Sequence, residues 1–152
     1  MVTPFEVLFP ALQPLSYQVT SPTDTAYNCI AWAAGDTQTW WWPDPDGLAY
    51  WPAGASRTET VAAFVTALGS LGYSPCAGGQ LEPGFEKVAL FADAQGRPRH
   101  AARQLPDGRW TSKMGELEDI AHGLHDLAGS VYGAVIQVLK RPAAAAQGRQ
   151  PG

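Results

Sequence analysis

One stretch organises the rest of the chain: Tyr27-Asn28-Cys29-Ile30-Ala31-Trp32-Ala33-Ala34-Gly35, preceded by Ser21-Pro22-Thr23-Asp24-Thr25. Ser, Thr and Asp ahead of a short apolar run are helix-start residues, and Gly35 is a typical stop. We therefore expect a short helix with Cys29 in its first turn. The unpaired N–H groups and the dipole of a helix start favour thiolate over thiol, so Cys29 is a candidate nucleophile. The alternative is a buried core thiol, because free cysteine is among the most buried residue types.

The length and composition indicate one globular domain, which we place at residues 1–141, followed by a flexible tail at 142–152. The apolar fraction is 45% and the charged fraction 16%, while thirteen Pro and sixteen Gly argue against an all-helical bundle. The net charge is −4 and the ten Lys and Arg residues are scattered. Nucleic acid is therefore not an expected partner.

The N-terminal residues lack a basic segment, and Pro4, Pro10 and Pro14 interrupt their apolar run, so we expect no signal peptide and a cytoplasmic location. No apolar run reaches the length of a membrane span, so no membrane partner is expected. The two cysteines are expected to be free thiols. The Cys and His residues show no zinc-ligand spacing, so neither a metal nor a cofactor is predicted. The oligomeric state is left open.

Residues 36–52 must form a loop, because three prolines and Gly47 exclude a regular helix. This loop contains Trp40-Trp41-Trp42 and Tyr50-Trp51. It either fills the core beside the first helix or forms one wall of a binding cleft, in which case Trp42 and Trp51 would contact substrate.

The remaining elements follow from periodicity and turn residues. Apolar spacings of three and four predict helices over 58–71 and 116–128. Alternation and turn residues predict strands over 17–20, 86–92, 98–105, 109–112 and 131–139. We expect an α+β domain in which the helices pack on an antiparallel sheet.

Three histidines could act as a base for Cys29. His122 and His125 fall on the predicted helix over 116–128, where exposed polar positions are the ordinary expectation. His100 lies within a predicted strand and points to one face of the sheet. If that face meets the start of the first helix, the imidazole reaches the thiol, which is the order of residues in cysteine hydrolases.

Several features follow one another along the chain: Tyr27 to Ala33, the strand with His100, the segment Trp110-Thr111-Ser112-Lys113-Met114-Gly115, then His122 and Tyr132-Gly133. In this order they resemble the papain-like cysteine hydrolases of bacteria, in the broad sense that includes the NlpC/P60-like proteins. The likeness is closest to a set of small bacterial proteins with a Tyr-Asn-Cys opening, a Trp/Pro-rich loop and a Ser-Lys-x-Gly segment. It spans residues 17 to 141 and implies a papain-like fold with the nucleophile helix packed on an antiparallel sheet.

The resemblance implies that Cys29 is the nucleophile and that His100 takes the thiol proton and returns it to the leaving amine. A third polar group then orients the imidazole from the next strand. Ser112 is the first choice, because its hydroxyl can accept the imidazole N–H, whereas a charged Lys113 cannot. The family patterns place Asn, Asp, Gln or His at this point, so this chain departs from them there.

The oxyanion formed on attack needs donors, and the Cys29 backbone N–H is one by position. Asn28, Thr23 and Gln18 are side-chain candidates for the other, although Asn28 is equally expected to be a helix cap.

Further substrate contacts are expected from Gln104 and Lys113. Lys113 could bind a substrate carboxylate or pair with Glu116 or Glu118, and for Arg103 a surface salt bridge is the simpler interpretation.

We expect a cysteine hydrolase or transferase acting through a thioester on a peptide, isopeptide or peptidoglycan-type amide. One alternative enzyme is a transglutaminase- or deamidase-like protein that uses the same Cys and His. The alternative from another class is a non-catalytic module that binds a peptide or protein partner through its Trp-rich loop.

Overall fold

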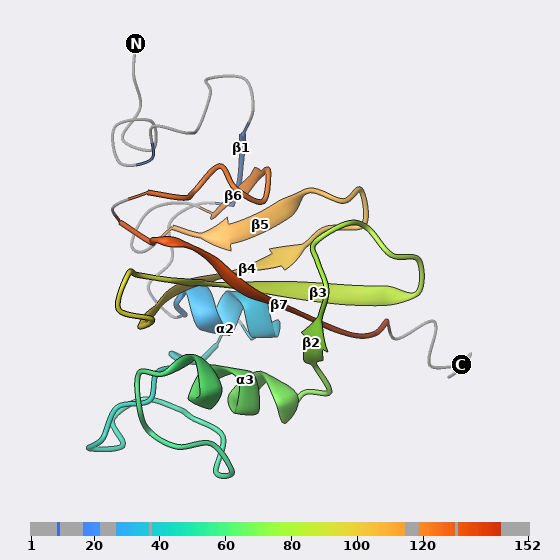
Figure 1. The fold of residues 1–152 in the computed structure, drawn as a ribbon. Helices are drawn as coiled ribbons and strands as arrows, with labels where there is room; N and C mark the ends of the chain where they lie inside the picture. The colour runs from blue at the N-terminus through green and yellow to red at the C-terminus, as the bar shows by residue number, and fades with distance from the viewer. Residues whose placement is uncertain are drawn as a thin grey trace.

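Seven antiparallel strands dominate the computed structural model, which describes residues 9, 17–21, 27–36, 38–114, 119–129 and 131–143. The sheet order is β1-β6-β5-β4-β3-β7-β2 (Figure 1). The strands are β1 Gln18–Ser21, β2 Ser74–Cys76, β3 Phe85–Ala92, β4 Pro98–Gln104, β5 Trp110–Lys113, β6 Asp119–His122 and β7 Ala134–Pro142. Two helices accompany them in this part of the chain, α2 Cys29–Ala34 and α3 Val61–Gly69.

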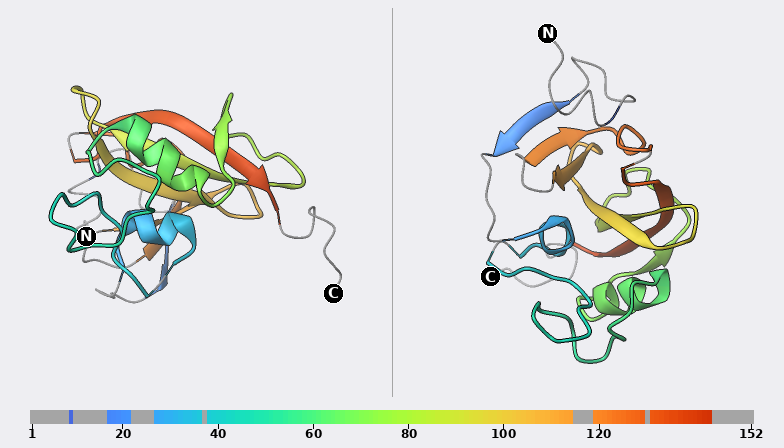
Figure 2. Two further views of the ribbon diagram at one scale, coloured as in Figure 1. Left: turned by 90° about the horizontal axis from the view of Figure 1, so that it is seen from below. Right: turned by 90° about the vertical axis from the view of Figure 1, so that its left-hand side faces the viewer.

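The centre of the sheet is a meander of consecutive strands from β3 to β6. The turn after β3 needs a left-handed residue at Gly96, where φ is 79°, and the turn after β4 needs one at Gly108. The predicted hairpins at these turns are confirmed. After β6 the chain crosses to the far side of β3 and returns as β7. At the opposite edge β1 pairs with β6, beside which it lies in the right-hand view of Figure 2.

The predicted first helix is confirmed, with Cys29 as its first residue. Asn28 is its N-cap and accepts a hydrogen bond from the Ala31 N–H, while Gly35 adopts φ 85° at the C-cap. The second helix begins at Val61 after the cap residue Thr60 and ends at Gly69, inside its predicted range.

The two faces of the sheet carry separate hydrophobic clusters. On one face, residues of both helices and of the Trp-rich loop pack on Val88, Leu90, Ala101 and Leu139. Figure 1 shows the two helices on this side. On the other face lie Phe9, Ala89, Phe91, Ala102, Trp110, Met114, Ile120, Leu127 and Val138. Because side chains alternate along a strand, neighbouring residues of β4 contribute to different clusters.

The expected papain-like α+β architecture is wrong. The described residues are mostly one antiparallel sheet, and the two helices contain only six and nine residues. The helix predicted over 116–128 is also wrong, because Asp119–His122 is strand β6 and turns follow it from Leu124 to Ala128. Ile120, Ala121, Leu124 and Leu127 do have helical spacing, but pairing of β6 with both β5 and β1 overrides that local pattern.

Some sequence expectations fall outside the described residues: Thr23, Glu116, Glu118 and the tail from 144 to 152. Pro142, expected to open the tail, is instead the last residue of β7. No helix in the described part of the chain has the length and apolar character that a bilayer crossing requires.

Candidate functional site

Three polar side chains meet on the face of the sheet that lies away from the helices. His100 of β4, Ser112 of β5 and His122 of β6 are each fully buried. The Ser112 Oγ lies 2.9 Å from the His100 Nε2 and 2.7 Å from the His122 Nε2. The His122 Nδ1 lies 2.7 Å from the Gly123 carbonyl oxygen. The predicted contact between His100 and Ser112 is therefore present, and His122 extends it.

The carbonyl of Gly123 fixes the direction of this hydrogen-bond chain. A carbonyl oxygen only accepts, so the His122 Nδ1 must carry the proton. In a neutral His122 the Nε2 is then an acceptor and takes the Ser112 hydroxyl proton. The Ser112 oxygen is left to accept from the His100 Nε2–H. The protons are assigned from the network, and they leave the His100 Nδ1 unprotonated.

Both imidazoles are neutral near pH 7. Burial lowers the pKa of His122 to about 4, although the hydrogen bond to Gly123 raises it in part. Burial, and secondarily His122, hold the pKa of His100 well below its ordinary value. The His100 Nδ1 is buried and has no hydrogen-bond partner within the described protein. It is thus a buried, unsatisfied proton acceptor.

Tyr132 covers the His100 ring. The two rings are stacked with centroids 3.9 Å apart and planes 6° apart, and Phe91 meets His100 edge-on at 5.3 Å. Burial raises the pKa of Tyr132, and the charge of a Cys29 thiolate would raise it further. The Cys29 thiol therefore lies within electrostatic range of the Tyr132 hydroxyl.

Cys29 is a half-buried thiol rather than a thiolate. Burial raises its pKa to about 11, against opposing effects of the backbone N–H groups of Ala101, Ile30 and Cys29 and of the Lys113 charge. The expectation that the helix start would lower this pKa is wrong, because desolvation outweighs the N–H groups. Cys29 needs a base to become a nucleophile at neutral pH.

The sheet places Cys29 and His100 on different faces of β4. Helix α2 packs on the face that carries Ala101, and strand alternation turns His100 to the other face. β4 and β5 pair at only two positions, Arg103 with Thr111 and Gln104 with Trp110. Toward the start of β4 the pairing with β5 stops, and the Cys29 thiol lies beside the backbone N–H of Ala101 in this part of β4. Neither nitrogen of His100 is hydrogen-bonded to the sulfur.

Asn28 is saturated by structural hydrogen bonds. Its Oδ1 accepts from the N–H groups of Ala31 and Trp41, and its Nδ2 donates to the Trp41 carbonyl at 2.6 Å. The structure thus uses Asn28 as a cap and as an anchor for the Trp-rich loop. Of the other oxyanion candidates, the Gln18 backbone is described in β1, but its side chain is not.

Trp51 belongs to the core, and Trp42 packs against it. The Trp51 ring is buried against Phe64, and its Nε1 donates to the Ser56 carbonyl. Trp42 is half-buried and meets the same phenylalanine edge-on at 5.6 Å. Of the two roles left open for this loop, these contacts support core packing.

Gln104 and Lys113 are both buried. The Gln104 Nε2 donates to the Gly79 carbonyl at 2.8 Å, so this side chain lies away from the histidines. The Lys113 ammonium lies 5.6 Å from the centre of the Tyr27 ring, on the face of the sheet that α2 covers. Their proposed contacts with substrate stay predictions.

The sequence favoured His100 over His122 as the base, and it assigned Tyr132 no role in the site. The usable signal for His122 was its position ten residues after Ser112, which suits two antiparallel strands joined by a short turn, but the helical spacing of 116–128 masked it. Tyr132 lies in the turn before β7, and its contact with His100 depends on that crossover. His125 is exposed. The described residues contain no group of three or more His, Cys, Asp or Glu side chains that could hold a metal ion.

Fold and site together define an antiparallel-sheet domain with a buried His-Ser-His network on one face and a half-buried cysteine in the helix that packs on the other. The chain belongs to the family described as a domain of unknown function, DUF7689, whose model matches residues 18–140. No curated protein and no solved structure matches it. The family description names no activity, so function must be argued from the site.

Proposed function

We propose that the protein is a cysteine hydrolase or transferase that cleaves an amide or ester bond through a thioester on Cys29. The single observation that carries this proposal is the oriented chain from Gly123 through His122 and Ser112 to His100. It leaves one imidazole nitrogen as a buried base without a partner. Tyr132, which is stacked on that imidazole, is electrostatically coupled to Cys29, a thiol that needs a base.

In the first half-reaction the His100 Nδ1 takes the Cys29 thiol proton, and the sulfur attacks the carbonyl carbon of the substrate. The carbonyl π electrons move onto oxygen to form the tetrahedral oxyanion. When this intermediate collapses, the bond to the leaving group breaks. His100 returns the proton to the departing amine or alcohol, and the acyl group remains on sulfur.

In the second half-reaction water or an acceptor amine attacks the thioester. His100 removes a proton from the attacking group and returns it to the sulfur as the thioester bond breaks. Water gives hydrolysis or deamidation, and an amine gives transfer. The choice between them depends on the acceptor, because the groups on the protein are the same.

Proton transfer requires the sulfur and the His100 Nδ1 to meet where β4 and β5 separate. The Tyr132 ring lies against His100 and is electrostatically coupled to Cys29, so displacement of this ring is the movement that the proposal requires. The high pKa of Cys29 and the low pKa of His100 keep both groups neutral until a carbonyl is bound. A thiol in this state is protected from adventitious alkylation.

Acylation by p-nitrophenyl acetate tests the proposal. We expect acetylation of Cys29, located by peptide mass spectrometry, to be much faster than acetylation of Cys76, which provides the internal reference. His100→Gln should slow acetylation of Cys29 roughly 100-fold or more, the scale of general-base catalysis. Ser112→Ala should give an intermediate loss and a shifted pH profile, because the hydroxyl orients the base.

A Cys76→Ser variant controls for non-specific acylation and should keep the wild-type rate at Cys29. Circular dichroism melts establish that the His100→Gln variant is folded before its rate is compared. Equal acetylation of the two cysteines, or an unchanged rate in folded His100→Gln, would overturn the proposal.

A second candidate is a non-catalytic module that binds a peptide or protein partner through the Trp-rich loop. The loop favours this candidate because the side chains of Trp40, Leu48 and Tyr50 are 44%, 84% and 49% exposed. The position of His100 on the face of the sheet opposite α2 favours it as well. In that case Cys29→Ala would leave the protein's biological effect intact, whereas the enzyme would lose it.

A further inference from the structure

Arg103 of β4 carries a positive charge that no described residue neutralises. The salt bridge expected for it is not formed with any residue that the structure describes, and none of those residues accepts a hydrogen bond from its guanidinium. The Nε is buried, whereas the two terminal nitrogens are not among the buried unpaired atoms of the described chain. The outer edge of the guanidinium is therefore open to a ligand.

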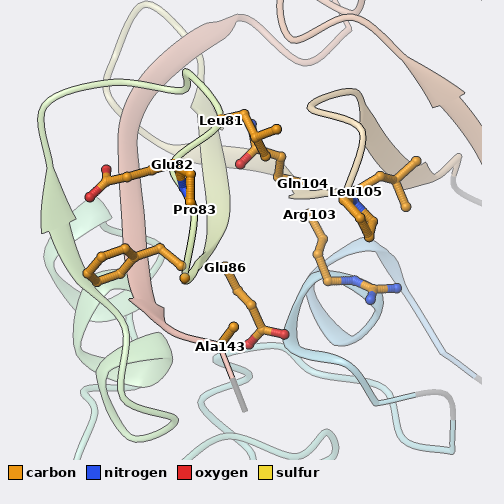
Figure 3. A pocket seen from close by; sticks show the side chains of 11 residues that line it. Leu81, Glu82, Pro83, Glu86, Arg103, Gln104, Leu105 and Ala143 are labelled. Atoms are coloured by element: carbon orange, nitrogen blue, oxygen red, sulfur yellow. The ribbon is translucent and has the colours of Figure 1, made fainter. Parts of the chain in front are cut away.

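Glu86 does not supply the missing acceptor. Arg103 and Glu86 both line a cavity of about 520 Å³, and in Figure 3 the Arg103 guanidinium points away from Glu86 and toward α2. The Glu86 carboxylate instead pairs with Arg141 at 2.8 Å. The charge of Arg103 is thus directed to the side of the sheet that α2 covers.

Trp32 of α2 holds the guanidinium in place. The guanidinium carbon lies 5.0 Å from the centre of the Trp32 ring, a cation–π contact. The ring itself is fixed, because its Nε1 donates to the Thr111 Oγ1 at 3.1 Å and it stacks on Tyr27 at 5.5 Å. The cation is therefore positioned before any ligand arrives.

This cation lies close to Cys29 along the same two elements. Cys29 and Trp32 are one helical turn apart on α2 and both are half-buried. The Cys29 thiol lies beside the N–H of Ala101, and Trp32 lies under Arg103. Ala101 and Arg103 are neighbours on one face of β4, and such neighbours are about 6.5–7 Å apart. One step along the strand therefore leads from the thiol to the arginine.

The chemistry of the guanidinium favours a carboxylate as the ligand. Two terminal N–H groups of an arginine fit the two oxygens of a carboxylate, and the single charges of the two groups cancel. A phosphate monoester carries a charge of about −1.5 to −2 near pH 7, which one arginine does not balance.

We propose that Arg103 is the substrate-binding residue of the Cys29 site and selects substrates that carry a carboxylate near the bond to be cleaved. The carboxylate pairs with the terminal nitrogens of Arg103, and this contact places the neighbouring carbonyl carbon at the Cys29 sulfur. The inference rests on the function proposed above and adds the class of substrate.

Alkylation of the whole protein by iodoacetate and by iodoacetamide tests this contact. The two reagents are similar in size and differ in charge, and in both the sulfur attacks carbon while iodide leaves. Peptide mass spectrometry gives the ratio of the two rates at each cysteine, in which the pKa of the thiol cancels. We expect this acid-to-amide ratio to be roughly tenfold or more higher at Cys29 than at Cys76, the scale of a hydrogen bond between charged groups.

Variants assign the preference to a residue. Arg103→Met keeps an unbranched side chain over Trp32 and should lower the ratio at Cys29 to that at Cys76. Arg99→Met is the matched control, because it removes the same charge from an exposed position on the same strand, and it should keep the wild-type ratio.

His100→Gln should also keep the ratio, because the proposed base affects the two reagents equally. If p-nitrophenyl acetate fails to acetylate Cys29 selectively while the ratio is retained, the enzyme is overturned and the contact of Arg103 with carboxylates is supported.

Equal ratios at the two cysteines, no alkylation of Cys29 by either reagent, or an unchanged ratio in folded Arg103→Met would overturn the inference. Protection of Cys29 from iodoacetate by inorganic phosphate at a lower concentration than by acetate would overturn the carboxylate assignment. The comparison of Cys29 with Cys76 is made in the wild-type protein, so it holds even if a variant folds poorly.

Discussion

Asn28 connects the start of α2 to the Trp-rich loop by three buried hydrogen bonds. Asn28→Ala removes the N-cap and also leaves both backbone groups of Trp41 without that partner. We expect a loss of about 2–3 kcal/mol in the free energy of unfolding, measured by urea titration. Thr60→Ala removes only the cap of α3 and should cost about 1 kcal/mol. An Asn28→Ala loss no larger than this control would show that the loop does not depend on the anchor.

At the scale of single residues, local pattern and side-chain chemistry predicted part of the site. Ser, Thr and Asp before an apolar run placed Cys29 at a helix start. The contact of Ser112 with His100 was predicted from the family resemblance and from the ability of a hydroxyl to accept the imidazole N–H. The pKa of Cys29 was not predictable, because it depends on burial by segments distant in sequence. The same is true of Tyr132, whose place over His100 comes from the return of the chain to β7.

The Trp-rich loop acts as a packing element between α2 and α3. Trp51 is 4% exposed and packs on Phe64, while Trp40 in the same loop is 44% exposed. Trp51→Ala should therefore lower the free energy of unfolding by about 3–5 kcal/mol. Trp40→Ala should change it by less than about 1 kcal/mol, since a half-exposed ring loses little packing. Urea unfolding followed by circular dichroism gives both values, and similar losses would argue against a packing role for the loop.

The elements that sequence reasoning placed correctly are those with turn residues at both ends. The β3–β4 and β4–β5 hairpins have Asp-x-x-Gly and Pro-Asp-Gly turns, and these punctuate the strands clearly. β6 was mistaken for a helix because a four-residue strand is too short to show alternation against a helical spacing. The α+β class was inferred partly from that helix, so the error at β6 contributed to the error in fold class, whereas the papain-like architecture came from the resemblance of motifs.

Across the whole molecule, buried titratable groups limit stability at both ends of the pH range. The folded His122 has a pKa of about 4, whereas its ordinary value is 6.5. As pH falls below about 6.5, the unfolded chain binds a proton that the folded protein does not, so the folded state loses stability. Burial gives His100 a shift in the same direction. The folded Cys29 has a pKa of about 11, whereas the ordinary value for cysteine is 9.0. As pH rises above about 9, the unfolded chain loses a proton that the folded protein retains, so the folded state loses stability.

We therefore expect the free energy of unfolding to be highest between about pH 6.5 and 9 and to decline on both sides, as measured by urea titration at each pH. His122→Gln should flatten the acid decline, whereas His125→Gln, which removes an exposed histidine, should leave it unchanged. Cys29→Ser should flatten the alkaline decline while Cys76→Ser keeps it. If His122→Gln and His125→Gln have the same acid slope, His122 is not held neutral by the fold. The oriented chain that makes the His100 Nδ1 a base would then lose its support, because only a neutral His122 can accept the Ser112 proton.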